Sequence, residues 1–145
     1  MAPTPTFDQA ITQASAAIAA ARAAPLSLKK AWLAALLIDQ AADALFAAKH
    51  GGQGDDILVF RAALAAKSEA LALVFAIAGR ELELSTETVE VALGDYNSLS
   101  TADFMVSLYN AHTVQRVRVA LPDGGRVDVH EVLREALAAL SEDNR

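Results

Sequence analysis

Two long stretches of this sequence are apolar on every side when they are drawn as helices, which restricts the possible folds severely. The first begins at Ser27 and ends near His50, where the glycines of KHGGQGDD stop it. The second begins at Asp55 or Asp56 and ends near Gly79. A helix that is apolar all round has to be covered all round. Three helices cannot easily achieve this alone, so the rest of the chain or a second subunit has to contribute.

A first, amphipathic helix precedes these two stretches. Thr6 and Gln9 form the pattern of a capping box, and Pro25 ends the helix. One apolar stripe recurs between them at helical spacing, formed by Phe7, Ala10, Ile11, Ala14, Ala17, Ile18 and Ala21. We therefore expect an N-terminal three-helix bundle over residues 6–80, after a short tail at residues 1–5.

The third of these helices carries two kinds of apolar surface. Its small side chains form a strip that allows a close neighbour, comprising Ala65, Ser68, Ala72, Ala76 and Gly79. Leu71, Val74 and Phe75 point away from that strip and need a partner of their own. We expect these three residues to lie in the interface of a homodimer.

The second half of the chain alternates between apolar and polar residues, as half-buried strands do. In ELELSTETVEVAL, the pattern predicts a strand pair over residues 82–93 with its turn near Ser85–Glu87, although a partly helical segment is the alternative. In VQRVRVALPDGGRVDV, it predicts a hairpin with a three-residue loop, Asp123–Gly125. That loop places Val119 opposite Val129, with Gly125 in the left-handed conformation.

A last helix follows, because Asp128 and Glu131 read as a capping box before a clean apolar stripe. Residues 141–145 form a polar tail. The expected fold is a single α+β domain that is mostly helical. In it, the bundle packs on an α+β portion at residues 81–140, with a small antiparallel sheet of two hairpins and two further helices.

Composition excludes several classes of function. The chain has 145 residues, a net charge of −6 and a pI of about 4.9, so phosphate backbones repel it and nucleic-acid binding is not expected. Cysteine is absent, which removes thiolate chemistry and fits the cytoplasm. The apolar run from Ala70 to Gly79 is shorter than the roughly 20 residues that span a membrane. We expect no membrane association and no cofactor.

The segment DYNSLSTADFMVSLYNAH, residues 95–112, has two interpretations. Ser100 and Asp103 form a capping pattern, so a helix should begin at Thr101, with Phe104, Met105, Leu108 and Tyr109 facing the core. The alternative is a pocket for a small anion or carboxylate. Its donors would be the side chains of Tyr109, Asn110, His112 and Arg116.

Charged residues on the helices and strands have structural interpretations as well. Asp39 and Asp43 lie one turn apart and His50 lies two turns further, which is too far for a shared metal ion. Lys67 should extend to water or pair with one of these aspartates. On the strands, two arginines should pair with glutamates across the sheet, namely Arg116 and Arg118 with Glu81, Glu83 and Glu90.

The sequence carries no catalytic motif of the G-x-G-x-x-G, Walker or G-x-S-x-G type. We therefore expect a non-enzymatic interaction or assembly protein that acts as a homodimer. The alternative is a small-ligand-binding protein or enzyme that uses Tyr109, His112 and Arg116.

Overall fold

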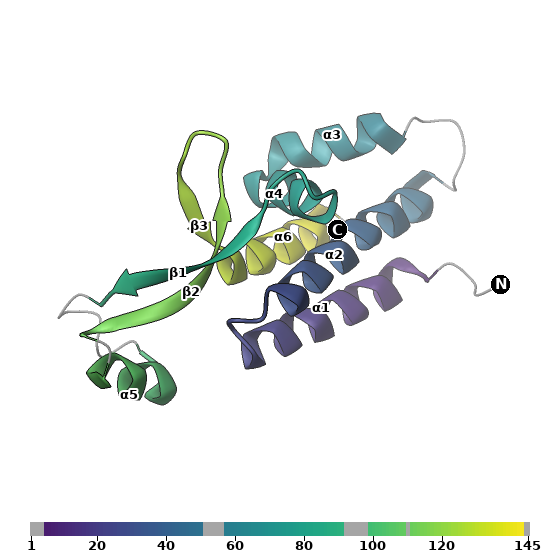
Figure 1. Cartoon of the computed structure of the whole chain (residues 1–145). Helices are drawn as coiled ribbons and strands as arrows, with labels where there is room; N and C mark the ends of the chain where they lie inside the picture. The colour runs from purple at the N-terminus through teal and green to yellow at the C-terminus, as the bar shows by residue number, and fades with distance from the viewer. Residues whose placement is uncertain (1–4, 51–56, 92–98, 110, 144–145) are drawn as a thin grey trace.

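The computed structural model describes residues 5–50, 57–91, 99–109 and 111–143, and their arrangement is α+β and mostly helical, as predicted (Figure 1). Within these ranges the chain forms six helices and three strands. In order, they are α1 (Phe7–Ala23), α2 (Leu28–His50), α3 (Ile57–Lys67), α4 (Glu69–Ala78), β1 (Leu84–Glu90), α5 (Thr101–Tyr109), β2 (Thr113–Ala120), β3 (Arg126–Asp128) and α6 (Val129–Asp143).

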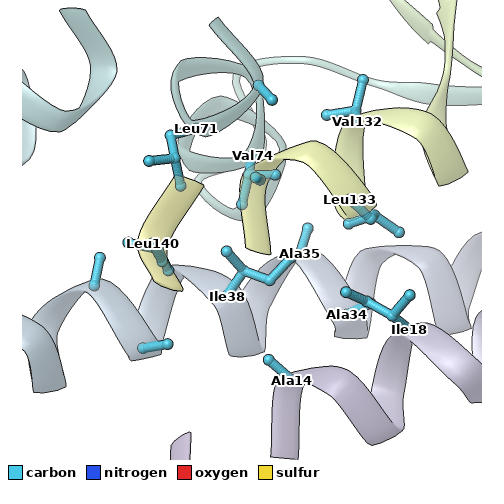
Figure 2. Packing of buried hydrophobic residues seen from close by; sticks show 14 of the residues in the cluster. Ala14, Ile18, Ala34, Ala35, Ile38, Leu71, Val74, Val132, Leu133 and Leu140 are labelled. Carbon is cyan, nitrogen blue, oxygen red and sulfur yellow. The ribbon is translucent and has the colours of Figure 1, made fainter. Parts of the chain in front are cut away.

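Helix α1 lies at the edge of the helical body and forms a close pair with α2. The predicted capping box of α1 is present: the Gln9 N–H donates to Thr6 Oγ1 (3.2 Å), and the Thr6 N–H donates to Gln9 Oε1 (3.0 Å). Ala14 and Ile18 of α1 face Ala34 of α2 (Figure 2), and Ala14 and Ala34 are completely buried. Alanine brings no bulk to such a contact, so the two helices can approach closely.

Helix α2 is the centre of the fold and is covered mainly by helices of its own chain. It contacts α1, α4 and α6, and its Ala35 and Ile38 point toward Leu133 and Leu140 of α6 (Figure 2). All four of these side chains are fully buried. The predicted bundle of three helices is thus not formed by those helices alone, because α6, from the C-terminal end of the chain, packs with α1, α2 and α4.

The predicted third helix is two helices, α3 and α4, which are separated at Ser68. Ser68 has an extended backbone (φ −140°, ψ 113°), and its Oγ accepts a hydrogen bond from the Leu71 N–H at 3.2 Å. This is the geometry of an N-cap, which serine forms readily. The break allows α4 to pack against both α2 and α6, while α3 lies outside α4.

The sheet has three antiparallel strands in the order β1-β2-β3, so the expected hairpin within residues 82–93 is wrong. The residues expected to turn, Ser85–Glu87, lie within the continuous strand β1 and pair with Val117, Arg118 and neighbouring residues of β2. This segment contains no glycine or proline to fix a turn, whereas its threonines and Val89 favour extended backbone.

The β2–β3 hairpin has a three-residue loop, as predicted, but the loop is Pro122–Gly124. Val119 pairs with Val127 rather than Val129, and the Leu121 N–H donates to the Gly125 carbonyl at 2.8 Å. The left-handed residue is Gly124 (φ +89°), not Gly125. The pairing differs from the predicted one by two residues, so the apolar side chains keep the face that was predicted for them.

Asp128 caps α6 as predicted, since its Oδ2 accepts a hydrogen bond from the Glu131 N–H at 3.1 Å. The helix continues to Asp143, so three residues of the predicted polar tail are helical. On the opposite side of the molecule, β1 and β2 extend away from the helical body as a two-stranded arm (Figure 1). Helix α5 lies at the far end of that arm.

Candidate functional site

Helix α5 is held on the arm by polar contacts. The Asp103 N–H donates to Ser100 Oγ at 3.1 Å, which confirms the predicted N-cap. The Asp103 carboxylate then forms an ion pair with Arg116 of β2 at 3.1 Å. Ser107 is completely buried, and its hydroxyl donates to the Phe104 carbonyl at 2.8 Å. The side of α5 that faces the arm is thus its polar side.

The apolar side of α5 faces outward. Phe104, Met105, Leu108 and Tyr109 are 40%, 48%, 51% and 82% exposed, and Val106 beside them is 44% exposed. At 100° per residue, the first four span about 140° of one continuous helix face. The expectation that they face the core was wrong. The arm carries α5 away from the centre of the helical body, and α5 packs against β2. Its Ala102, Asp103 and Val106 border a cavity beside residues 24–27, between α1 and α2.

This orientation reverses the usual pattern of a surface helix, which buries its apolar residues and exposes its polar ones. Exposed apolar side chains that stand singly are common on proteins, but a contiguous group on one helix marks an interaction site. The apolar face, meaning residues 104–106, 108 and 109, is the candidate functional site.

Three residues of the predicted anion pocket, Tyr109, His112 and Arg116, lie around the same end of the arm, and these described residues do not form an enclosed site. Tyr109 is largely in solvent, and Arg116 is already paired with Asp103. His112 is exposed and has a left-handed backbone (φ +63°). Asn110 lies outside the described residues. The pocket hypothesis stays a prediction, and the geometry of these three described residues gives it no support.

The residues predicted for a dimer interface belong to the core of the chain itself. Leu71 is 1% exposed and Val74 is fully buried, and both point toward the space between α2 and α6 (Figure 2). Phe75 is half-buried beneath the guanidinium of Arg61, which lies 4.2 Å from the ring centroid. The chain itself covers Leu71 and Val74, which leave no surface there for a second subunit, whereas the interface role of the half-buried Phe75 stays a prediction.

Asp39 and Asp43 are the two carboxylates that bind Arg61. Arg61 Nη2 pairs with Asp39 and Nη1 with Asp43 at 2.9 Å, and Nη1 also donates to the Asp39 carbonyl at 3.2 Å. Burial raises the pKa of the Asp39 carboxyl above its usual value, although the charge of Arg61 acts against this. No group of acidic or histidine side chains in the described ranges is arranged to bind a metal ion.

Sequence reasoning overlooked Arg61, which occupies the position between α2 and α3 that was considered for Lys67. Lys67 extends to water, the first of its two predicted placements: its side chain is 72% exposed and pairs with Asp143 at 3.4 Å, as does Lys49 at 3.1 Å. Arginine suits the buried position better, because its planar guanidinium can bind two carboxylates and stack on an aromatic ring at once. The signal that could have identified it is that Arg61 is the one charged residue of α3 before Lys67 at its end, while Asp39 and Asp43 lie one turn apart on α2.

Cross-strand ion pairs are present, but the glutamate differs from those predicted. Glu87 of β1 lies 3.8 Å from Arg118 and 3.7 Å from Arg126. Glu87 falls within the segment that was expected to turn. The error in the first hairpin is therefore also the reason that this residue was missed.

Helix α2 has the length and composition of a membrane-spanning segment over Leu28–Lys49, which is longer than the run considered from the sequence. Half of the most apolar part of this segment is buried inside the fold. A central core helix has the same properties, and α2 occupies the centre of this fold. The expectation of no membrane association stays a prediction.

Comparisons with known proteins give no relative: no protein-family model, curated protein or solved structure matches the chain.

Proposed function

We propose that this protein is a non-enzymatic assembly protein that forms a homodimer through the apolar face of α5. The observation that supports this proposal is the reversed orientation of α5, which buries Ser107, turns the half-buried Asp103 toward β2 and presents Phe104, Leu108 and Tyr109 to solvent. The predicted homodimer is retained, but its interface moves from α4 to the arm.

The area of the apolar face is sufficient for a weak dimer. Its five side chains are between 40% and 82% exposed, which together corresponds to between two and three complete side chains. At roughly 200 Å² per large side chain, each copy offers about 500 Å². A self-complementary contact would bury at most about 1,000 Å² in total, which is below the roughly 1,200–2,000 Å² of stable specific interfaces and in the range of weak, transient ones.

The charge of the apolar face also favours a second copy. The carboxylate of Asp103 is neutralised by Arg116 within the same chain, so the face presents no unpaired charge of its own to a partner. Two copies of an acidic chain repel each other, and an uncharged contact region minimises that repulsion. A single helix face can pack on its own copy about a two-fold axis, which is the commonest symmetry among soluble oligomers.

Sedimentation equilibrium of the purified chain, with two matched variants, tests the proposal. We expect a monomer–dimer equilibrium at micromolar concentration. Leu108→Glu should weaken it by roughly 100-fold or more, because an unpaired charge buried in the contact costs several kcal/mol. Val59→Glu is the matched control, since Val59 is 67% exposed on α3 and should leave the equilibrium unchanged.

A monomeric parent chain at these concentrations would contradict the homodimer. If the parent stays monomeric and α5 instead binds a different protein, the apolar face is an interaction site but the proposed occupant is wrong. Equal weakening by Leu108→Glu and Val59→Glu would also contradict the proposal, because it would show that α5 has no special role.

A further inference from the structure

A groove on the helical body, far along the chain from α5, has the properties of a ligand site. It lies where the beginning of α2, the end of α4 and the start of β1 meet, and its volume is about 630 Å³. That volume falls within the range of small-molecule sites in proteins. Its lining combines apolar side chains with two cations and one carboxylate: Leu28, Trp32, Ile77, Leu82 and Leu84, with Lys29, Arg80 and Glu83.

The indole ring of Trp32 forms the aromatic wall of the groove. Its indole nitrogen is buried and has no hydrogen-bond partner in the described ranges. Because protein atoms cover that nitrogen, a ligand in the open groove would lie against the ring and would not bind the N–H.

Arg80 is held in an unusual conformation beside that tryptophan. Its backbone is left-handed (φ +59°), although the glycine that tolerates this conformation precedes it at Gly79 and has φ −82°. Left-handed backbone costs a non-glycine residue about 1–2 kcal/mol. This conformation ends α4, since the Arg80 N–H donates to the Ile77 carbonyl at 3.1 Å and the Glu81 N–H donates to the Ala76 carbonyl at 2.8 Å, as in a common helix C-cap. Here it places the guanidinium over the Trp32 ring, 4.6 Å from the centroid.

The cations of the groove are available for a ligand. Neither Arg80 nor Lys29 forms an ion pair with a carboxylate in the part of the chain that the structure describes. The exposed Glu83 lines the same groove, so the three charged side chains together carry a net charge of +1. Within a chain of net charge −6, this is a local site for an anion.

We propose that the groove binds a small organic carboxylate with an apolar body. The carboxylate pairs with the Arg80 guanidinium, which offers two parallel donors, and Lys29 adds a second positive charge. The apolar body lies on Leu28, Leu82 and Leu84 beside the indole ring. This site is independent of the proposed dimer, because none of the residues that line it belongs to α5.

The chain contains one tryptophan, so its fluorescence reports directly on this groove. We would titrate the full chain with octanoate, and in parallel with octan-1-ol as a neutral ligand of the same length. We expect a saturable change in Trp32 fluorescence with octanoate, and we expect octan-1-ol to bind more weakly than octanoate. Arg80→Gln should lower octanoate affinity by about tenfold or more, because a charge-assisted hydrogen bond is lost, and should leave the alcohol unaffected.

Three further variants separate this role from a structural one. Arg80→Lys should restore part of the octanoate affinity, and Lys29→Gln should lower it by a smaller factor. Arg22→Gln, at an exposed arginine of α1, should change nothing. Circular dichroism verifies that each variant is folded. Absence of saturable binding, or equal loss of octanoate and octan-1-ol affinity in Arg80→Gln, would overturn the proposal.

Discussion

Leu71 distinguishes a core position from an interface position, because the sequence placed it in a dimer interface and the structure places it in the core. Leu71→Ala removes about three carbon groups from a side chain that is 1% exposed. At about 0.8 kcal/mol per buried group, the transfer of these atoms alone accounts for roughly 2.4 kcal/mol. The cavity left between α2, α4 and α6 adds to this, for a total of about 3–4 kcal/mol.

Thermal unfolding followed by far-UV circular dichroism measures this loss. In a domain of this size, each kcal/mol corresponds to about 2–4 °C, so the melting temperature should fall by roughly 10 °C. Leu33→Ala is the matched control on α2, since Leu33 is 44% exposed, and should cost less than about 1 kcal/mol. The reasoning fails if Leu71→Ala costs as little as the control. It fails equally if its cost varies with protein concentration, as an interface residue would require.

Three further substitutions test local features of the fold by the same unfolding assay. Arg61→Met leaves Asp39 half-buried without its cation, so stability at neutral pH should fall by about 1–3 kcal/mol. Since burial raises the folded-state pKa of Asp39, its contribution is present below the unfolded pKa of about 3.9 and is lost as pH rises through the folded value. The free energy of unfolding should therefore fall more steeply with rising pH in the Arg61→Met variant than in the parent. A difference in free energy of unfolding that stays constant from pH 3 to pH 7 would contradict this. Gly124→Ala should cost about 1–2 kcal/mol because of its positive φ, whereas Gly124→Asn should cost less; equal costs would contradict a left-handed loop residue. Ser68→Ala should cost about 1 kcal/mol by removing the N-cap of α4, and no loss would indicate a continuous helix through this position.

The elements whose signals are local were predictable from the sequence. The capping pairs at Thr6, Ser100 and Asp128 all form, because each depends only on residues three positions away. The alternation of β2 and β3 likewise fixed which side chains share a face. The one-residue error in the position of the loop arose because two adjacent glycines can each adopt a left-handed backbone.

Features that depend on the placement of distant elements were not predictable. Ser68 interrupts a helix with strong local propensity, because α4 gains contacts with α2 and α6 by turning there. The orientation of α5 is the reverse of the predicted one for a similar reason. Its apolar residues repeat at helical spacing, and that pattern normally indicates contact with a core. Only the arm, which holds α5 through Asp103 and Arg116, reveals that no core lies on that side.

The groove beside Trp32 was also beyond the reach of sequence patterns. Trp32 lies in α2 and Arg80 follows α4, so the two residues are far apart in the sequence, and no spacing rule predicts their contact. The left-handed conformation of Arg80 could not be anticipated either, because the adjacent Gly79 is the residue that such a position usually takes.

Disulfide cross-linking at single introduced cysteines is the most direct measurement of whether α5 faces its own copy. The natural sequence has no cysteine, so any disulfide in such a variant joins two chains. We predict that Met105→Cys, on the outward face of α5, forms a covalent dimer rapidly under mild oxidation, whereas Val59→Cys on α3 does so slowly. Equal rates for the two variants, or a Met105→Cys chain that stays monomeric, would contradict the account.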